Sequence, residues 1–183
     1  MSNENSLPPE ISKVLISKEQ IQRRVEELGR KISADFQGEE LIVVGILRGA
    51  FLFMADLVRQ IDCPLKTEFM AVSSYGDATT SSGIVRIIKD LDESVEGKNI
   101  LIVEDIVDTG LTLSYLTSYL QGRSPKRIKI CVLCNKPQCH IKPVQIDYTG
   151  FQLPEEFVVG YGLDDRGYRR NLPYIGVLDP PKI

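Results

Sequence analysis

The residues best suited to chemistry are the carboxylates and hydroxyls of residues 100–112. Glu104 and Asp105 follow a run of apolar, mostly β-branched residues, which is typical of a buried strand that ends at the edge of a sheet. Asp108 opens a Thr-Gly-x-Thr turn before a helical pattern, and the free backbone N–H groups of such a turn form an anion site. Acids beside an anion site indicate a ligand that carries a phosphate together with hydroxyl groups or a metal ion.

The sequence lacks the motifs of several common enzyme classes. It contains no Walker loop, no Gly-x-Gly-x-x-Gly and no Gly-x-Ser-x-Gly, so ATP-type phosphate binding, dinucleotide binding and serine hydrolysis have no motif to support them. A catalytic triad is not expected, because His140 is the only histidine and lies in a polar segment flanked by prolines.

The cysteines suggest a zinc site at first sight, because Cys131, Cys134 and Cys139 precede His140 at short spacings. Residues 127–133 are predicted as a strand, however, and residues three apart in a strand point to opposite faces. Two ligands for one metal ion are therefore not expected from this strand, and free thiols are the favoured interpretation.

Size and composition predict one domain. The chain has 183 residues and a formal net charge of −3 at pH 7, which argues against a large nucleic-acid-binding surface. No apolar run reaches the roughly 20 residues of a membrane helix. The N-terminus is polar and does not resemble a secretory signal, so a cytoplasmic location without membrane or nucleic-acid partners is expected.

The hydrophobic pattern predicts strands that alternate with helices up to about residue 133. Helices are predicted after a capping box at Ser17–Gln20, over 50–61 and after residue 112, and strands over 41–46, 68–73, 84–88, 100–103, 127–133, 145–148, 157–161 and 174–178. This order predicts an α/β fold, in which helices cover both faces of a parallel sheet and ligands bind at the carboxyl ends of its strands. The core is expected over roughly 36–165, with a small irregular hood from the N-terminal and C-terminal segments.

Residues 100–112 resemble the signature of the type I phosphoribosyltransferases, which bind phosphoribosyl pyrophosphate (PRPP). The resemblance rests on the apolar strand, the paired acids and Asp-Thr-Gly-x-Thr at the spacing of the family, and it extends over most of the chain. Other segments resemble further elements of the family. They are the pyrophosphate loop at 45–50, the flexible catalytic loop that begins at Ser74-Tyr75 and includes 76–83, the purine-binding segments of hypoxanthine-guanine phosphoribosyltransferases at 135–137 and 157–164, and the element with a late arginine at 168–172.

The resemblance implies how PRPP is held. Backbone N–H groups and hydroxyls from Asp108 to Thr112 would bind the 5′-phosphate, and Glu104 and Asp105 would accept hydrogen bonds from the ribose hydroxyls. The residues implied in PRPP or nucleotide binding are Leu47, Arg48, Gly49, Ser74, Tyr75, Glu104, Asp105, Asp108, Thr109, Gly110, Leu111, Thr112 and Arg170.

Two arginines are candidates for the pyrophosphate, because the planar guanidinium suits oxyanions. Arg48 occupies a position where many relatives carry lysine. Arg169 competes with Arg170 for the role of the late arginine, and the spacing to its neighbours favours Arg170. The family also tends to place a cis peptide bond at the pyrophosphate loop, which predicts one at Leu47–Arg48.

For the base, the resemblance implies a purine site made of Lys136, Phe157, Val158 and Asp164. Asp108, the implied catalytic residue, would face N7 of a 6-oxopurine as general base or proton acceptor. Lys136 would donate to O6 and so select hypoxanthine and guanine over adenine, which offers a donor there. Phe157 would stack on the ring.

The implied reaction is displacement of pyrophosphate at C1′ of the ribose by N9 of the purine, through an oxocarbenium-like transition state. The implied cofactor is Mg²⁺, with Glu104, Asp105 and Asp164 as its ligands, the last partly through water. IMP and GMP would be the products from hypoxanthine and guanine.

Two alternatives stay open. A xanthine-preferring enzyme of the same fold would also use Asp108, and the sequence does not show how O2 of the base is recognised. A PRPP-sensing regulator that binds nucleic acid would lack catalytic groups or carry an added domain, and neither is expected here. The family usually forms dimers or tetramers, so a homodimer or homotetramer is expected.

Overall fold

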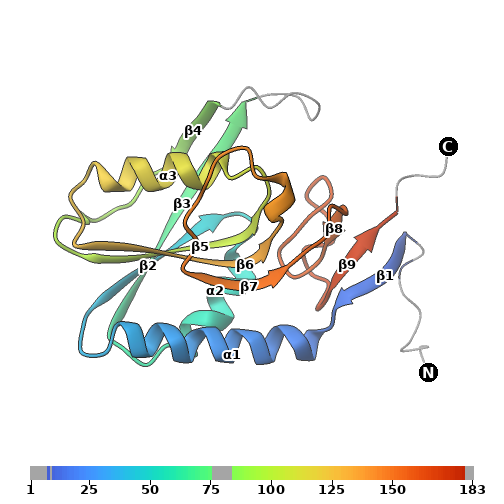
Figure 1. The fold of residues 1–183 in the computed structure, drawn as a ribbon, viewed down its shortest axis with the longest axis horizontal. Coiled ribbons are helices and arrows are strands. Elements are labelled where there is room, and N and C mark those ends of the chain that lie inside the picture. Colours follow the sequence, from blue (N-terminus) through green and yellow to red (C-terminus); the bar gives the residue numbers. More distant parts are fainter. Residues whose placement is uncertain (1–7, 9, 76–83, 180–183) are drawn as a thin grey trace.

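A six-stranded sheet forms the centre of the computed structural model, which describes residues 8, 10–75 and 84–179 (Figure 1). Its strand order is β4-β3-β2-β5-β6-β7, and neighbours run parallel except for β3 and β4. The strands are β2 (Leu41–Leu47), β3 (Leu65–Tyr75), β4 (Ile84–Lys89), β5 (Asn99–Val107), β6 (Arg127–Asn135) and β7 (Tyr148–Gln152). The prediction of an α/β fold around a parallel sheet is confirmed.

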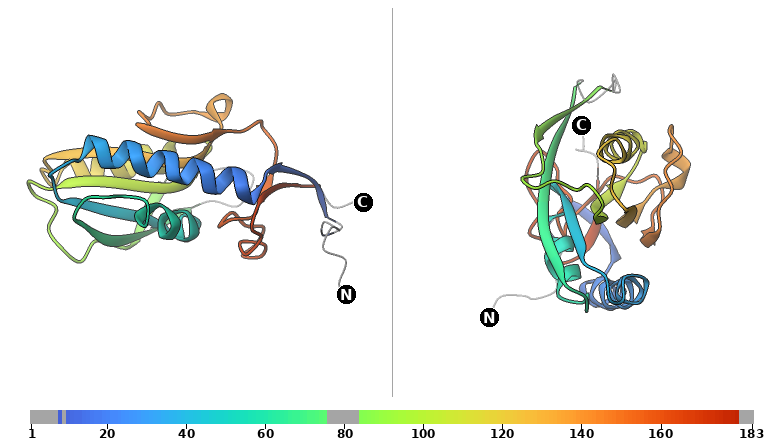
Figure 2. Two further views of the ribbon diagram at one scale, coloured as in Figure 1. Left: turned by 90° about the horizontal axis from the view of Figure 1, so that it is seen from below. Right: turned by 90° about the vertical axis from the view of Figure 1, so that its left-hand side faces the viewer.

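Helices cover both faces of this sheet, as predicted. α1 (Lys18–Asp35) and α2 (Phe51–Val58) lie on one face, and α3 (Leu111–Gln121) lies on the other (Figures 1 and 2). The predicted capping box begins α1: Oγ of Ser17 accepts a hydrogen bond from the backbone N–H of Gln20, and Oε1 of Gln20 accepts one from the N–H of Ser17. Within the described residues, no helix combines the length and the apolar character needed to cross a membrane.

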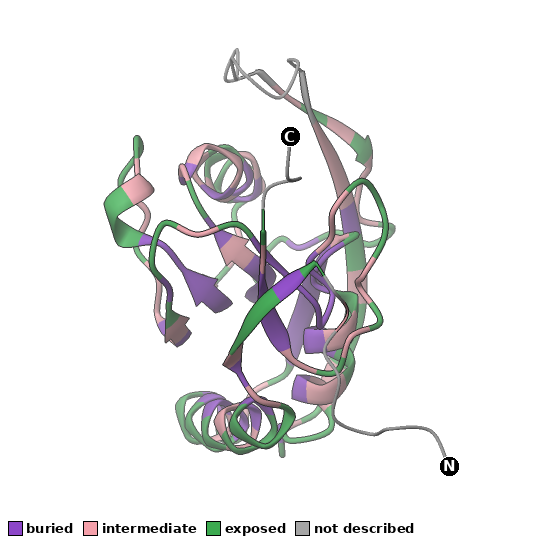
Figure 3. Cartoon of the chain, turned by 90° about the vertical axis from the view of Figure 1, so that its right-hand side faces the viewer, coloured by how far each residue is buried: buried purple, intermediate pink, exposed green. Residues whose placement is uncertain are grey.

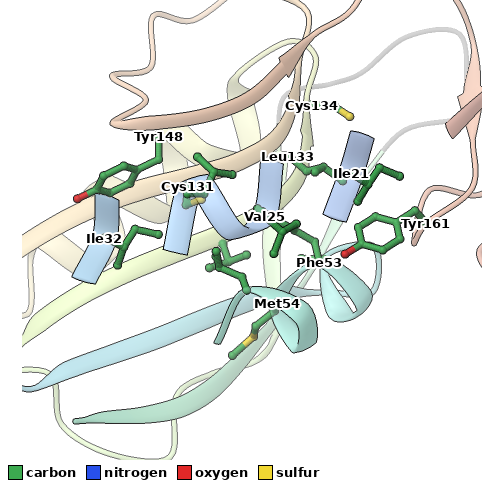
Figure 4. Packing of buried hydrophobic residues seen from close by; sticks show 14 of the residues in the cluster. Ile21, Val25, Ile32, Phe53, Met54, Cys131, Leu133, Cys134, Tyr148 and Tyr161 are labelled. Atoms are coloured by element: carbon green, nitrogen blue, oxygen red, sulfur yellow. The ribbon is translucent and has the colours of Figure 1, made fainter. Parts of the chain in front are cut away.

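The strand β5 is buried on both faces, which explains its continuous apolar run. Leu101 and Val103 pack with the side chains of α1 and α2, whereas Ile100 and Ile102 pack with those of α3. Figure 3 shows the buried centre of the sheet and the exposed outer side of α1. Figure 4 shows the packing beneath the sheet, with Ile21, Val25 and Ile32 from α1 and Phe53 and Met54 from α2. Helix α1 therefore contributes to the buried core together with α2.

A second, smaller sheet contains both ends of the described chain. Its strands are β1 (Ile11–Ile16), β9 (Ile175–Leu178) and β8 (Val158–Val159), in the order β1-β9-β8, and they pair antiparallel. It lies beyond the carboxyl ends of β6 and β7 (Figure 1). The N-terminal and C-terminal segments thus form the small hood that the sequence predicts beside the main sheet.

The strand predicted at 145–148 is displaced along the chain, because β7 spans Tyr148–Gln152. Gly150 lies in its middle, and glycine weakens a strand pattern. The structure requires this glycine, since a Cβ there would lie within 3.0 Å of the carbonyl oxygen of Leu133 in the neighbouring strand. Arg24 of α1 donates to the carbonyl oxygens of Thr149 and Gly150 and fixes the outer edge of β7.

Two further elements are shorter than predicted. The helix predicted over 50–61 ends at Val58, because the N–H groups of Gln60 and Ile61 bond three residues back and tighten the chain into a turn. The strand predicted over 157–161 is reduced to β8, since the chain leaves the extended conformation at Gly160, where φ is +104°.

The four cysteines are free thiols. Cys131 and Cys134 are both buried in the hydrophobic cluster beneath the sheet, although their spacing predicts opposite faces. Burial raises the pKa of each thiol well above its usual value. The histidine of the hypothetical zinc motif lies next to Asn135, with its Nε2 2.8 Å from Oδ1 of that residue.

Candidate active site

The turn 47–49, at the carboxyl end of β2, contacts Asp105 of the neighbouring strand β5. The peptide bond Leu47–Arg48 is cis, so that prediction is confirmed. Arg48 is exposed, whereas Gly49 is buried against the carboxylate of Asp105. A Cβ on Gly49 would lie within 3.0 Å of both carboxylate oxygens of Asp105, so only glycine allows this approach.

The other side of the same turn contacts the segment after β8. A Cβ on Gly162, whose φ is +99°, would lie within 3.0 Å of the carbonyl oxygen of Gly49. The N–H of Gly162 donates to the carbonyl oxygen of Arg170 at 2.9 Å, and the guanidinium of Arg170 donates back to that of Gly162. Arg170 also lies 2.6 Å from Oδ1 of Asp164. Asp105, Gly49, Gly162, Arg170 and Asp164 therefore form one continuous set of contacts.

Glu104 and Asp105 lie inside β5, not after its end, and they are only 8% and 9% exposed. Burial raises the pKa of Glu104 well above its usual value, and the charge of Asp105 raises it further. Burial also raises the pKa of Asp105, while a hydrogen bond from Glu104 and the charge of Arg170 act in the opposite direction. Burial beside a second acid thus disfavours the charged form of Glu104 more than that of Asp105, whose charge Arg170 stabilises.

The predicted phosphate loop connects β5 to α3. Asp108 is exposed at its start, and Gly110 forms the N-cap of α3 with φ +78°. Gly110 has no side chain to cap the helix, and the N–H of Leu111 donates to Oγ1 of Thr109 at 3.4 Å. A helix start of this kind suits an anion. A cavity of about 110 Å³ beside the loop is lined by Glu104, Ile106, Val107, Asp108, Thr109, Gly110, Thr112 and Leu113.

The predicted base-binding residues lie at the ends of β6 and β8. The ammonium of Lys136, a buried residue, donates to the carbonyl oxygen of Glu156 at 2.7 Å, directly before Phe157. Phe157 is 56% exposed and Val158 is buried. The N–H of Lys136 donates to the carbonyl oxygen of Val107, the residue before Asp108. Lys136 is thus the link between Phe157 and the phosphate loop.

Some predicted residues stand apart from this arrangement. Arg169 bonds to Asp165 and lies 3.6 Å from Glu10, so it faces away from Asp164, which supports Arg170 as the late arginine. The segment 76–83 and the side chains of Ser74 and Tyr75 lie outside the described residues. A larger hollow of about 590 Å³ shares only Phe157 with the predicted site.

Sequence reasoning missed two parts of the site. Gly162 supports the turn at Gly49, and its signal was the Gly-Tyr-Gly at 160–162, where closely spaced glycines mark a backbone with unusual φ angles. The carbonyl oxygen of Glu156 holds the Lys136 ammonium, and a backbone acceptor leaves no signal in the sequence.

Glu104 and Asp105 suit a hard cation, because they offer buried carboxylate oxygens, the ligands that Mg²⁺ prefers. Asp164 suits it less well: Oδ1 bonds to Arg170 and Oδ2 accepts from the N–H of Gly167 at 2.6 Å. Over residues 10–75 and 84–179, no three acidic, histidine or cysteine side chains converge on a common metal position. The residues thus fit a metal ion that bonds chiefly to the substrate, with Glu104 and Asp105 beside it.

A parallel sheet with a glycine turn at a helix start and paired acids near its carboxyl edge has the arrangement that the sequence predicts for a phosphoribosyltransferase. Residues 15–166 match the model of the phosphoribosyl transferase domain, and the chain belongs to this family. It is 54% identical over 171 residues to the hypoxanthine-guanine phosphoribosyltransferase of Bacillus subtilis, with 93% of this chain and 95% of the relative covered. The enzyme of that name from Mycobacterium tuberculosis is 50% identical over 179 residues, with 94% and 89% covered.

Solved structures agree with this result. The chain resembles a crystal structure of a hypoxanthine phosphoribosyltransferase from Staphylococcus aureus with a TM-score of 0.92 and 46% identity over 97% of each chain. A hypoxanthine-guanine phosphoribosyltransferase from Bacillus anthracis gives a TM-score of 0.89 at 44% identity, with 93% of this chain and 100% of that chain covered.

Burial of two neighbouring acids is expected to lower the stability of the ligand-free protein at neutral pH. Since folding raises the pKa of Glu104, its carboxyl contributes most stability at low pH and loses it as pH rises through the ordinary glutamate range toward the raised pKa. Glu104→Gln is therefore expected to raise the Tm of the free protein at neutral pH by about 2–4 °C, and this gain should shrink toward pH 4. The same change should weaken PRPP binding about tenfold, because a hydroxyl acceptor is lost.

Differential scanning calorimetry between pH 4 and 8, with and without PRPP, measures both effects. Glu96→Gln, at an exposed turn, is the control and should leave both Tm and PRPP binding unchanged. A lower Tm for Glu104→Gln at neutral pH would show that the pair is not strained.

Proposed function

We propose that this protein transfers the 5-phosphoribosyl group from PRPP to N9 of hypoxanthine and guanine, giving IMP or GMP and pyrophosphate in purine salvage. The observation that carries the proposal is the placement of Asp108 between two sets of groups. The loop proposed for the phosphate follows it in the chain. The N–H of Lys136 donates to the carbonyl oxygen of Val107, the residue before Asp108, and the ammonium of Lys136 donates to that of Glu156, next to Phe157. Relatives of about 50% identity that bear the name of this enzyme support it.

The PRPP side of the site works by positioning and by charge. The first N–H groups of α3 and the hydroxyls of Thr109 and Thr112 hold the 5′-phosphate. Asp105 and Glu104 accept hydrogen bonds from the 2′- and 3′-hydroxyls, which fixes C1′ in the space beside Asp108. Arg170 and the N–H groups of the turn 47–49 bind the pyrophosphate, and Arg48 adds its charge at the surface.

On the base side, Asp108 accepts the proton of the purine at N7, which makes N9 more nucleophilic as the bond to C1′ forms. Phe157 stacks on the ring, and Val158 presents backbone groups at its edge. Lys136 donates to O6, and the carbonyl oxygen of Glu156 aims its ammonium there. Adenine offers a donor in place of O6, so binding it would leave two donors opposed.

The proposal includes Mg²⁺, a cytoplasmic location and assembly into a homodimer or homotetramer. Mg²⁺ supplies neutralisation of the leaving pyrophosphate, with Glu104, Asp105 and Asp164 as the residues that would hold it or its water molecules. Glu104 and Asp105 would also contribute acceptors for the ribose, and Arg170 would share the charge of the leaving group.

A measurement of products separates an enzyme from a PRPP sensor of the same fold. Incubation with PRPP, hypoxanthine and Mg²⁺ is expected to yield IMP and pyrophosphate in equal amounts, quantified by liquid chromatography and a coupled pyrophosphate assay. PRPP binding without either product, together with a salt-sensitive gel shift on DNA, would favour the sensor instead.

A further inference from the structure

His140, the only histidine of the chain, lies in the segment 136–142 that follows β6. Its Nε2 is 2.8 Å from Oδ1 of Asn135, the last residue of β6. Asn135 is 8% exposed, and its backbone pairs with that of Val107 in β5. Val107 is the residue before Asp108, so the side-chain amide of Asn135 starts from a fixed position in the sheet close to Asp108. Because an amide oxygen can only accept, Nε2 carries the hydrogen of this bond.

The C-terminal end of the segment 136–142 contacts the predicted phosphate loop through backbone hydrogen bonds. The N–H groups of Ile141 and Lys142 both donate to the carbonyl oxygen of Thr109, at 2.9 and 3.1 Å. A Cβ on Gly110 would lie 2.5 Å from the carbonyl oxygen of Lys142, so the two backbones are in direct contact. The peptide plane between Thr109 and Gly110, which starts α3, is therefore fixed from outside its own loop.

The N-terminal end of the segment 136–142 includes Lys136, the lysine of the proposed base site. The N–H of Lys136 donates to Val107 and its ammonium to Glu156, while Nε2 of Gln138 donates to the carbonyl oxygen of Leu153 at 3.0 Å. One short segment thus touches both the phosphate loop and the base site. The hydrogen bond from His140 to Asn135 connects this segment to the last residue of β6.

We propose that His140 is a positioning residue for both substrates. Its hydrogen bond to Asn135 fixes the conformation of the segment 136–142. That segment in turn keeps Thr109, Gly110 and Lys136 in place near Asp108. The inference rests on the proposed function, but its structural part concerns a contact that exists without substrate. Both protonation states of the imidazole can donate through Nε2, so the bond persists whether or not His140 is charged.

The kinetic test compares five variants with the wild type. His140→Ala is expected to raise KM for both PRPP and hypoxanthine about fivefold, as for the loss of one neutral hydrogen bond, and to leave kcat within about twofold. His140→Gln, which places an amide N–H near the position of Nε2, should restore both KM values. Asn135→Ala should match His140→Ala, and the double variant should be no worse than either alone. Gln145→Ala, at an exposed position after the segment, is the control for general effects of mutation.

Unchanged KM values in His140→Ala, a rise for only one substrate, or additive effects in the double variant would overturn the proposal. A purely structural role would lower Tm without moving either KM, and that result also counts against it.

A second measurement needs no variant. Because the chain has one histidine, a ¹⁵N spectrum of the untagged wild-type protein shows the imidazole of His140 alone. The Nε2–H tautomer is expected, and Nδ1–H or a rapidly averaging ring would contradict the proposal. This spectrum does not depend on enzyme activity. An inactive wild-type protein would contradict the proposed function, and the spectrum would still show whether His140 donates the hydrogen bond to Asn135.

Discussion

Asp108→Asn is expected to lower kcat with hypoxanthine by roughly 10²–10⁴-fold, the range found for the loss of a general base. Asparagine keeps the size of the side chain and can still donate or accept a hydrogen bond, but it cannot take the proton from N7. Asp108 is exposed at the carboxyl end of β5, where a bound purine can reach it. The phosphate loop that follows it is built from backbone groups, so PRPP binding should change by less than about threefold.

Steady-state kinetics with a direct measurement of the PRPP dissociation constant separate these effects. Asp92→Asn is the matched control, since this exposed carboxylate pairs with Lys89 away from the site, and its kinetics should equal those of the wild type. Turnover of Asp108→Asn close to that of the wild type would remove Asp108 from the role of proton acceptor. A large loss of PRPP affinity would show that its charge organises the phosphate loop instead.

Gly49→Ala is expected to have the second large effect, a rise of at least about 100-fold in KM for PRPP. The added Cβ would meet the carboxylate of Asp105, which cannot retreat easily because Oδ1 accepts a hydrogen bond from the N–H of Ile106 at 2.9 Å. Gly162 closes the opposite side of the turn, so the turn cannot shift that way either. The displaced turn would misalign the N–H groups proposed for the pyrophosphate.

Gly122→Ala is the control for this change, because a Cβ there would lie at an ordinary contact distance of 3.5 Å from its nearest neighbour. Circular dichroism should show that Gly49→Ala is folded, and calorimetric titration with PRPP reports binding directly. A normal KM for PRPP in Gly49→Ala would mean that the turn is not part of the pyrophosphate site.

Local features of the fold were predictable because their causes lie close together in the chain. The capping box of α1 and the buried runs of β2 and β5 are set by neighbouring residues. The turn that begins α3 is a local feature too, since Gly110 adopts a positive φ and forms the N-cap within the motif itself. The cis bond at Leu47–Arg48 was predictable only through the family resemblance, because its sequence carries no proline.

Long-range contacts could not be predicted in the same way. The contact of Gly49 with Gly162 joins residues far apart in the chain, and only the folded structure brings them together. Gly150 weakened the pattern of β7, although close approach to Leu133 requires it there. The location of Cys131 and Cys134 in one cluster was likewise missed, because regular alternation along a strand predicts opposite faces.

The surroundings of the paired acids could not be read from the motif alone. Their adjacency predicted a binding role for Glu104 and Asp105, whereas their burial inside β5, which raises the pKa of both, depends on the neighbouring strands. In the same way, the ion pair between Asp164 and Arg170 joins two residues that the resemblance placed in different roles.

The most direct test of 6-oxopurine phosphoribosyl transfer is kcat/KM measured spectrophotometrically with PRPP and Mg²⁺ against four bases. We expect a high kcat/KM for hypoxanthine and guanine. The value for adenine should be at least about 10²-fold lower, because its amino group is a donor that would face the donor of Lys136. A preference for adenine would contradict the roles given to Lys136 and Asp108, and a preference for xanthine would show that recognition at O2 dominates.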